Sequence, residues 1–371
     1  HQGMGDGRLV AYGYSSWLQL FNARQLLHLR MLERALREFP PSIREHLALA
    51  YSSHLPSNCV LASYTPKWRR LTPLFSIRGF RHIARPTELN PWLDGVGRGT
   101  YPNAIRKIVR AREYAIMPRE PLLRGGFAPV PAVAGGQHTI RCVDSSREGK
   151  LRPGSVDMVL TDPPYFDFIH YAGLASFFAP WLSLLGLTAR QNRKSVAQRS
   201  LAGRKECDVS AAKFTRRIAA VFVRAEELMR NGALMVFTYR HSSADGWMSL
   251  AEALAQSSLE VIQVIPLPGE ARSGLHVSEG SSRWDAVLVL RKQRLNRLSR
   301  GIPVAALSRA HALAEKWKSR FVNMEKLQFT TADFDNLRKA LVIGAALGMS
   351  EPADNDGQAV NWTELRSWLG E

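Results

Sequence analysis

One stretch of the chain decides the fold: Val156-Asp157-Met158-Val159-Leu160-Thr161-Asp162-Pro163-Pro164-Tyr165-Phe166. Its apolar first half has the length of a buried strand, and the two prolines end that strand because proline has no N–H for a sheet ladder. The polar residues Thr161 and Asp162 therefore stand at the carboxyl end of a strand. In open α/β folds this edge of the sheet is where ligands bind.

The segments on both sides of this stretch alternate between strand and helix patterns. Helices are expected at Phe177–Leu185, Ala211–Met229 and Trp247–Ser257, and strands at His138–Val143, Ala233–Thr238, Leu259–Pro266 and Trp284–Arg291. Asn231-Gly232 is expected to cap the end of the long helix. The alternation predicts an α/β fold with a Rossmann-like, largely parallel sheet and helices on both faces.

Composition divides the chain into four parts. Residues 1–117 combine a helical block at residues 15–55 with an irregular basic region, and residues 118–136, rich in proline and glycine, are expected to be a linker. Residues 137–292 form the α/β domain. Residues 293–371 are expected to be an appended helical tail.

The chain is strongly basic, since 50 Lys and Arg against 32 Asp and Glu give 371 residues a formal net charge of +18. Such an excess favours a polyanionic partner, and nucleic acid is the most common one. An interface with an acidic subunit is the alternative.

Other classes of protein are disfavoured by the cysteines and by the hydropathy. Cys59, Cys142 and Cys207 form no CxxC pair and have no His at ligand spacing, so neither a disulfide framework nor a metal site is expected. No apolar run reaches the roughly 18 residues that span a bilayer, and no signal-peptide pattern is present. We therefore expect a cytoplasmic location. The first residue is His1 rather than Met, which suggests either a processed end or a further region upstream.

Asp162-Pro163-Pro164-Tyr165 resembles the catalytic motif of the methyltransferases that form N6-methyladenine or N4-methylcytosine in DNA. The resemblance implies a methyltransferase sheet, S-adenosyl-L-methionine as the cofactor, and DNA as the substrate, with N6 of adenine favoured over N4 of cytosine. It also implies that the target base leaves the duplex. A proline-rich turn with a capping aspartate is the alternative without chemistry.

The resemblance gives each residue of the motif a role. An exocyclic amine is a poor nucleophile because its lone pair is delocalised into the ring, so the site has to localise this pair toward the sulfonium methyl. Asp162 and the carbonyl of Pro163 would accept hydrogen bonds from the amine, while Pro164 helps to fix the backbone. Tyr165 would stack on the base, and Phe166 would complete that face.

Further residues are implied by the same resemblance. The cofactor would lie near the ends of neighbouring strands, at Asp144, Thr161, Asp162 and Thr238. A helix N-cap is an equal alternative for Asp144, and a plain strand end is the alternative for Thr238 and Tyr239. His276 is expected to approach the base from a loop that follows a strand, although a generic exposed loop explains the same segment.

Several other stretches are similar to the large adenine-specific DNA methylases of bacteria and archaea: Tyr12-Gly13, Leu20-Phe21, Arg24-Gln25-Leu26, Glu88-Leu89-Asn90-Pro91 and Arg272-Ser273-Gly274-Leu275-His276. This resemblance spans about residues 10–292. It implies a role in restriction-modification or phage defence, with residues 1–117 serving target recognition.

One part of the family's pattern is missing. These enzymes hold the methionine moiety of the cofactor with a glycine-rich loop after the first strand, and the glycine-rich segment Leu93–Gly99 follows no apolar strand. An upstream segment or a partner chain is therefore expected to carry this loop. The alternatives are a catalytically incomplete subunit that binds DNA or a partner, and an enzyme that acts on RNA or a protein glutamine.

Two basic regions, residues 67–85 and 190–205, are expected to contact DNA phosphates. Together with one arginine of the loop before His276, the candidates are Arg69, Arg70, Arg81, Arg193, Lys194, Arg204, Lys205 and Arg272.

Overall fold

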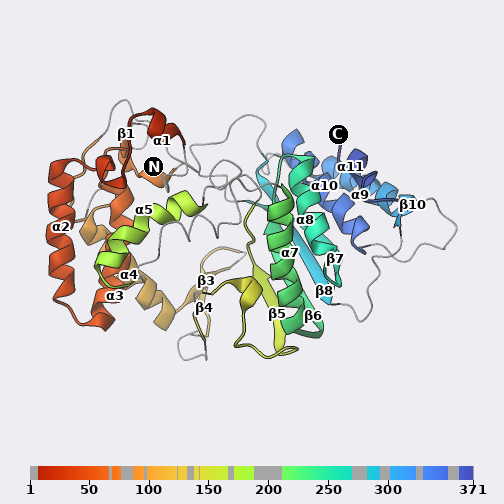
Figure 1. The fold of residues 1–371 in the computed structure, drawn as a ribbon, viewed down its shortest axis with the longest axis horizontal. Coiled ribbons are helices and arrows are strands. Elements are labelled where there is room, and N and C mark those ends of the chain that lie inside the picture. The colour runs from red at the N-terminus through yellow and green to blue at the C-terminus, as the bar shows by residue number, and fades with distance from the viewer. Residues whose placement is uncertain are drawn as a thin grey trace. The chain divides into compact units, whose positions relative to one another are not determined.

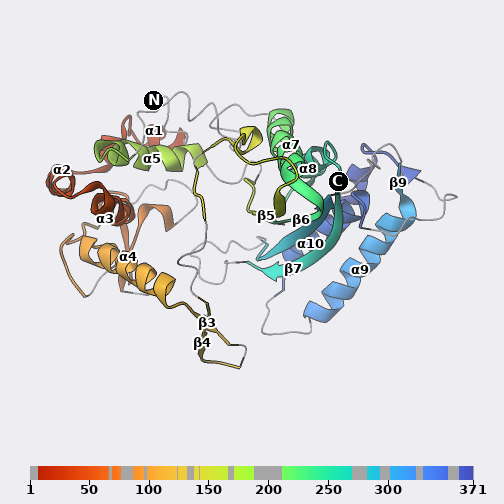
Figure 2. The same cartoon turned by 90° about the horizontal axis from the view of Figure 1, so that it is seen from below.

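The computed structural model describes residues 7–66, 69–76, 87–95, 98–122, 124–131, 138–141, 143–165, 171–187, 211–269, 282–292, 301–322, 329–349 and 359–370. The chain divides into two compact units. Unit 1 comprises residues 1–141 and 170–200, and unit 2 comprises residues 142–169 and 201–371. The elements of both units are labelled in Figure 1 and seen from below in Figure 2.

Unit 1 is mostly helical. Its helices are α1 (Gly7–Ala11), α2 (Ala23–Arg37), α3 (Pro41–His54), α4 (Tyr101–Ile116) and α5 (Tyr171–Leu184), with 3₁₀ turns at Trp17–Leu20, Leu55–Ser57 and Leu74–Ser76. Two short antiparallel pairs are formed by β1 (Ser63–Thr65) with β2 (Arg70–Thr72) and by β3 (Arg119–Pro121) with β4 (Phe127–Pro129). The helical block at residues 15–55 is confirmed, whereas the expected linker contains the β3–β4 hairpin.

Aromatic side chains of α5 fill the core of unit 1. Phe177, fully buried, packs edge-on against Trp17 and stacks on Phe21, with ring centroids 5.9 and 5.8 Å apart. Trp181 also contacts Phe21 at 5.2 Å. The helix lies in the sequence range expected for the α/β domain, yet it belongs to unit 1. The reason is that α5 carries no charged residue and buries its apolar surface against the N-terminal helices.

A buried histidine joins α3 to the segment before α4. His54 donates from Nδ1 to the carbonyl of Gly99 at 2.6 Å, and its Nε2 lies 3.0 Å from Nε2 of His28. Gly99 has a φ of 86°, and a Cβ there would lie 2.0 Å from Oγ of Ser57, so only glycine fits. Burial lowers the pKa of His54 to about 4, despite its bond to Gly99.

Unit 2 has a mixed α/β architecture around a four-stranded sheet in the order β5-β6-β8-β7. β5 (Val156–Thr161) runs parallel to β6 (Met229–Tyr239), whereas β8 (Trp284–Lys292) runs antiparallel to β6 and to β7 (Leu259–Pro268). The other elements are a 3₁₀ turn at Ser145–Arg147, α7 (Ala211–Leu228), α8 (Ala244–Leu254), β9 (Ile302–Pro303), α9 (Val304–Val322), α10 (Thr331–Ala346), β10 (Ala359–Val360) and α11 (Leu365–Trp368). None of the helices described combines the length and the apolar character needed to cross a membrane.

The elements expected between residues 156 and 292 are confirmed within a few residues, but their topology differs. The prediction of a largely parallel sheet is wrong, because β7 and β8 are antiparallel neighbours whose ladder continues through a bond from Gly269 N to the carbonyl of Arg283. The strand expected at residues 138–143 is also wrong, since residues 138–141 and 143 belong to no strand.

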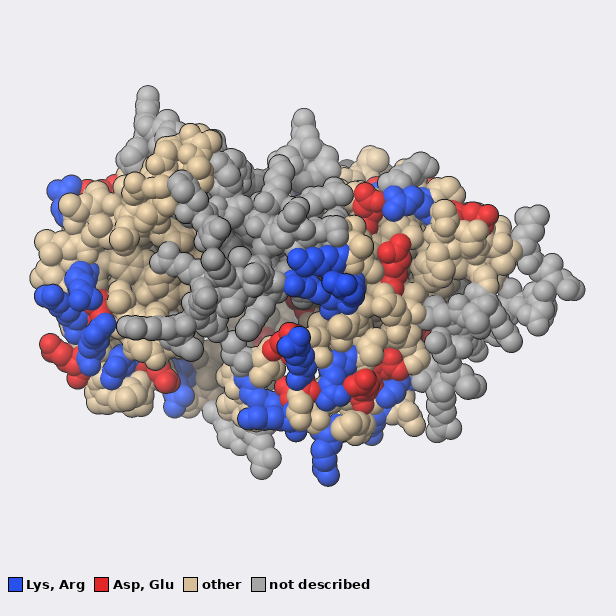
Figure 3. All heavy atoms as spheres, in the orientation of Figure 1, with Lys and Arg blue, Asp and Glu red and all other residues tan. Residues whose placement is uncertain are grey.

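Helices cover one face of the sheet (Figure 1). Phe222 of α7 stacks on Phe237 of β6 at 5.7 Å, and Trp247 of α8 lies edge-on to Tyr239 at 4.9 Å. α10 packs on β7 and β8 at the same face. Its Gly344 lies against Val264, the partner of Leu288 in the ladder. α7 also carries Lys213, Arg216, Arg217 and Arg224, and Figure 3 shows basic side chains over this helix.

The opposite face of the sheet is only partly covered, and its part over β5, β6 and β8 is largely apolar. It presents Met158, Leu160, Val236, Val287 and Val289, which alternate with the buried residues. Met158 is 55% exposed and Leu160 is 75% exposed, although both lie within a strand. No helix of the described chain covers this face in the way that α7, α8 and α10 cover the other, so the expected second helical layer is not found there.

α7 leads into β6 without a loop. Lys292, the last residue of β8, donates from Nζ to the carbonyls of Glu226 and Met229 at 2.7 and 2.9 Å. A lysine amine, rather than the expected Asn231-Gly232 cap, therefore satisfies the helix end. Gly232, with a φ of 75°, lies instead in the irregular part of the β5–β6 ladder.

The C-terminal helices belong to the core of unit 2 rather than to an appended tail. Fully buried Asp333 accepts hydrogen bonds from the backbone N–H groups of Thr330, Arg283 and Trp284, and from the hydroxyls of Thr330 and Ser282. Asn336, one turn later, donates to the carbonyl of Trp284 at 3.0 Å. These bonds attach the start of α10 to the start of β8.

Replacing Asp333 with Ala is expected to destabilise unit 2 by about 3 kcal/mol or more, because the buried N–H groups at the start of β8 lose their acceptor. Urea unfolding followed by tryptophan fluorescence measures the change. The control Glu315→Ala removes an exposed partner of Lys318 and should cost less than about 1 kcal/mol. Equal effects of the two substitutions would contradict the anchoring role of Asp333.

Unit 1 is expected to lose stability as the pH falls from about 6.5 to 4. The unfolded chain protonates His54 near the ordinary pKa of 6.5, whereas the folded unit resists protonation down to about 4. The unfolded state therefore binds more protons in this window, and the full shift corresponds to about 3 kcal/mol. Thermal unfolding at pH 7 and at pH 4.5 measures it. His54→Asn should flatten the pH dependence, whereas His46→Asn, at an exposed position, should leave it unchanged.

Candidate functional site

The residues after β5 leave the sheet beside the end of β6. Thr161 pairs with Phe237 in the parallel ladder, so the next residues of both strands emerge at the same edge. Pro163 and Pro164 have no N–H to continue the ladder. Pro163 is buried, while the side chain of Asp162 is exposed. The structure thus places Asp162 at the carboxyl edge of the sheet, as the sequence predicts.

Two hydroxyls hold one oxygen of the Asp162 carboxylate. Thr238 Oγ1 donates to Asp162 Oδ1 at 2.9 Å, and the hydroxyl of Tyr165 donates to the same oxygen at 3.2 Å. Within the part of the chain that is described, Oδ2 accepts no hydrogen bond. One carboxylate oxygen is therefore fixed by the protein, and the other is open to a ligand.

Tyr165 is a buried support of this carboxylate. Its side chain is 9% exposed, and its ring lies edge-on to the ring of Tyr239 with centroids 5.3 Å apart. Burial is the main cause that raises the pKa of the Tyr165 hydroxyl above its usual value, and the charges of Asp162 and Asp285 add to it. The Tyr165 hydroxyl therefore stays protonated at neutral pH and donates a hydrogen bond to Asp162. That Tyr165 stacks on a base stays a prediction.

An ion pair that the sequence analysis missed lies at the same edge. Arg240 follows β6 directly, and Asp285 is the second residue of β8, which starts at this edge because it runs antiparallel to β6. Arg240 Nη1 lies 3.3 Å from Asp285 Oδ1, and the side chains are only 12% and 17% exposed. The sequence signal for this ion pair was Asp285, a charged residue inside the apolar run Trp284–Arg291.

Gly269 lets the chain pass close to this ion pair. A Cβ at Gly269 would lie 2.8 Å from Oδ2 of Asp285 and 3.1 Å from Nη1 of Arg240. A larger residue would therefore displace one of the two charged side chains. The carboxyl edge thus brings together the described residues Asp162, Thr238 and Tyr165 with the pair Arg240–Asp285.

Asp144 caps a short turn in the structure. The backbone N–H and the hydroxyl of Ser146 donate to Asp144 Oδ1 at 3.0 and 2.7 Å, and the 3₁₀ turn Ser145–Arg147 follows. The N-cap alternative therefore accounts for this residue without a ligand. A contact between Asp144 and the cofactor stays a prediction.

Only two of the residues expected to contact phosphate are described. Arg69 and Arg70 are exposed in unit 1, where Arg69 adopts a left-handed conformation with a φ of 46° just before β2. The other candidates lie outside the described residues: Arg81, Arg193, Lys194, Arg204, Lys205 and Arg272, as well as Phe166 and His276.

The described residues contain no group of three or more His, Cys, Asp or Glu side chains that could hold a metal ion. No protein-family model matches the chain, and no curated protein matches it. The geometry around Asp162 is therefore the basis on which a chemistry can be assigned.

Proposed function

We propose that unit 2 is the substrate-amine half of an S-adenosyl-L-methionine-dependent DNA methyltransferase, with N6 of adenine favoured over N4 of cytosine. The observation that carries this proposal is the Asp162 carboxylate, with Oδ1 held by Thr238 and Tyr165 and with Oδ2 open at the sheet edge. The net charge of +18 supports a polyanionic substrate. Site-specific methylation of this kind would serve restriction-modification or phage defence.

Asp162 acts by positioning the amine rather than as a strong base. Oδ2 accepts a hydrogen bond from one N–H of the exocyclic amine, and the carbonyl of Pro163 is the second acceptor. These bonds localise the lone pair of the nitrogen in the direction of attack. Since Oδ1 already accepts two hydrogen bonds, the carboxylate cannot rotate freely, and Oδ2 keeps its orientation.

The described residues fit the target amine better than they fit the whole cofactor. S-adenosyl-L-methionine would supply the methyl group, and Thr161, Asp162 and Thr238 lie at the edge where it would have to bind. No backbone cradle for its methionine moiety is found among the described residues. We therefore propose that an upstream segment or a partner chain completes the cofactor site.

The surface of β5 supports such a completion. Within the described chain β5 pairs with β6 alone, and the face beside its free edge exposes Met158 and Leu160. A strand added parallel to β5, with its crossover helix over this face, would satisfy the ladder and bury both side chains. The loop between that strand and that helix would lie at the same edge as Asp162.

A second candidate function follows from the missing cradle. A methyltransferase-fold subunit that binds DNA, or assembles with a partner, without transferring a methyl group would keep the basic charge but would not need the arrangement of Asp162, Thr238 and Tyr165.

Asp162→Ala is expected to lower methyl transfer about 100-fold or more, while DNA affinity changes less than about twofold, because the flipped base is the part of the DNA that the carboxylate would contact. Thr238→Val should cause a smaller loss, about tenfold, since it frees Oδ1 without removing Oδ2. Nucleoside mass spectrometry of DNA incubated with the cofactor, the chain and the proposed upstream segment or partner chain measures the product and identifies the base.

The control Thr331→Val replaces an exposed threonine of α10 and should leave transfer unchanged. An equal loss of transfer and of DNA binding in Asp162→Ala would argue against the positioning role. Intact DNA binding without any methylation would favour the second candidate function.

Leu160→Lys is expected to prevent association with the upstream segment or partner chain, because it places a charge in the surface that the added helix has to bury. It should change the stability of unit 2 by less than about 0.5 kcal/mol, since Leu160 is already 75% exposed. Co-purification of the two separately expressed parts measures the association. Leu151→Lys, at an exposed position outside the sheet, is the matched control. Undiminished association of Leu160→Lys would refute the assignment of this surface.

A further inference from the structure

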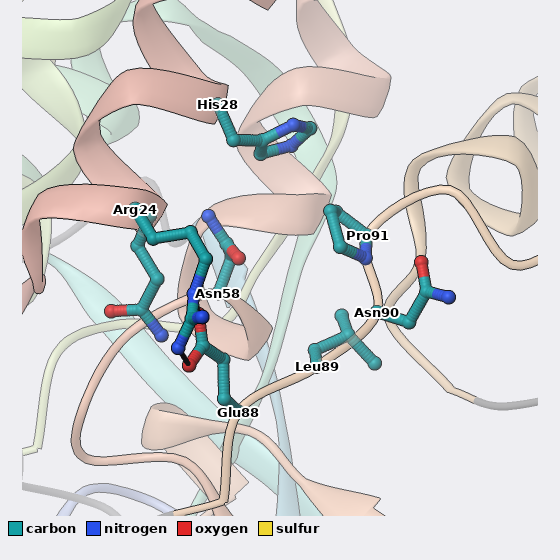
Figure 4. Close-up of a pocket in the computed structure, with 8 residues that line it drawn as sticks. Arg24, His28, Asn58, Glu88, Leu89, Asn90 and Pro91 are labelled. Carbon is teal, nitrogen blue, oxygen red and sulfur yellow. Dashed lines mark hydrogen bonds and ion pairs between the residues drawn. The ribbon is translucent and has the colours of Figure 1, made fainter.

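Unit 1 contains a cavity of about 260 Å³ between α2 and the segment that ends at Pro91 (Figure 4). Arg24 and His28 lie one turn apart on α2 and form one wall, with Gln25 beside them. Residues 88–91 form the opposite wall, and Asn58 lies between the two. Two stretches singled out in the sequence, Arg24-Gln25 and Glu88–Pro91, thus meet around one space.

The cavity offers no unbalanced charge to a ligand. Arg24 donates from Nε and Nη2 to the two oxygens of Glu88 at 2.8 and 2.6 Å, so the guanidinium and the carboxylate neutralise each other. No other Lys, Arg, Asp or Glu lines it. The lining therefore supplies no net charge that would attract a phosphate or a cation, and it suits a neutral ligand.

His28, the histidine that lines the cavity, is neutral, and its hydrogen bond with His54 defines its tautomer. His54 donates from Nδ1 to Gly99, and its low pKa keeps Nε2 unprotonated. His54 Nε2 must therefore accept the hydrogen from His28 Nε2, 3.0 Å away. Burial lowers the pKa of His28 as well. His28 is thus left with Nδ1 as an acceptor.

Besides His28 and the Arg24–Glu88 pair, the polar side chains that line the cavity are amides. Asn58 is 1% exposed, and its Nδ2 is buried without a hydrogen-bond partner within the described chain. Gln25 is oriented by a capping box with Asn22. Leu89 and Pro91 add apolar surface. The neighbouring Trp92 is 56% exposed and lies edge-on to His28 at 5.0 Å, which places an aromatic ring beside the cavity.

We propose that this cavity binds an adenine ring. A neutral, flat heterocycle matches the charge-balanced lining and the apolar surface of Leu89 and Pro91. An amide side chain matches the adjacent acceptor and donor at N7 and N6 of adenine. Gln25 and Asn58 both line the cavity and carry such an amide. The molecule that carries this adenine is inferred from the proposed function. It is either a nucleotide of DNA held outside the duplex or the adenosine moiety of the cofactor.

Titration calorimetry with adenosine, guanosine, cytidine, thymidine and 2-deoxyribose 5-phosphate tests the proposal. Adenosine should bind at least about fivefold more tightly than the other nucleosides, and the base-free phosphate should not bind. The affinity for adenosine should stay within about twofold between low and high salt, because no net charge is involved. Equal affinities for all four nucleosides, or binding of the base-free phosphate, would overturn the proposal.

A pair of tryptophan substitutions tests the location. Leu89→Trp fills the cavity from a partly exposed segment and should weaken adenosine binding at least about tenfold, whereas Leu93→Trp, four residues further along and outside the cavity, should leave it within about twofold. Asn58→Leu should weaken it about tenfold at an unchanged melting temperature. Undiminished affinity in Leu89→Trp overturns the proposal even if Asn58→Leu fails to fold.

Competition experiments identify the source of the ring. Displacement of adenosine by oligo(dA) but not by oligo(dT) assigns the cavity to DNA, and displacement by S-adenosylhomocysteine assigns it to the cofactor. Displacement by neither overturns the inference. Adenosine binding without DNA methylation therefore refutes the proposed function alone, and DNA methylation without adenosine binding refutes the cavity alone.

Discussion

The buried carboxylate of Asp333 is the constraint on which unit 2 depends. It gathers the N-terminus of α10 and the first residues of β8 around one pair of oxygens. Because β8 lies between β6 and β7, its position sets the register of both neighbours. Asp285, two residues after Arg283, is carried to the sheet edge by the same attachment. A helix from the C-terminal part of the chain thus determines the shape of an edge whose central motif lies far upstream.

At that edge the two oxygens of Asp162 differ in their hydrogen bonds. Oδ1 is used by the protein itself, since Thr238 and Tyr165 both donate to it. A carboxylate without these donors could turn about its terminal bond, and each orientation would present a different acceptor to a substrate. The buried ring of Tyr165 keeps its hydroxyl in place through the contact with Tyr239, whose own hydroxyl is bonded to the carbonyl of Gly246. The fixed orientation of Oδ2 therefore depends on the packing of Tyr165 in the hydrophobic core.

The parts of the fold that could be predicted are those with a local signal. β6 and β8 could be predicted because their apolar residues alternate with other residues or form a continuous run. The carboxyl edge could be predicted because two prolines come soon after Thr161. The same signals do not show which strand neighbours which, so the antiparallel β8 was missed. The burial of α5 in unit 1 and the role of Asp333 depend on contacts between residues far apart in sequence, and no spacing records them.

The candidate site was predictable to a similar extent. Asp162 and Thr238 were predicted from the family resemblance and from their places just after one strand and at the end of another, and the parallel pairing of β5 and β6 brings them together. Arg240 and Asp285 were missed because they become neighbours only through the antiparallel β6–β8 pairing. The cavity of unit 1 was missed for the same reason, since α2 and residues 88–91 share no local pattern.

The lysine at the end of β8 also determines the order in which unit 2 can assemble. The carbonyls at the end of α7 receive their hydrogen bonds from Lys292, which is 63 and 66 residues further along the chain. During synthesis α7 is therefore complete long before its C-terminal cap exists. Contacts of such large sequence separation slow folding, because a long loop has to close before they form. The sheet of unit 2 can be completed only after β8 has left the ribosome, and until then α7 remains a helix with an open end.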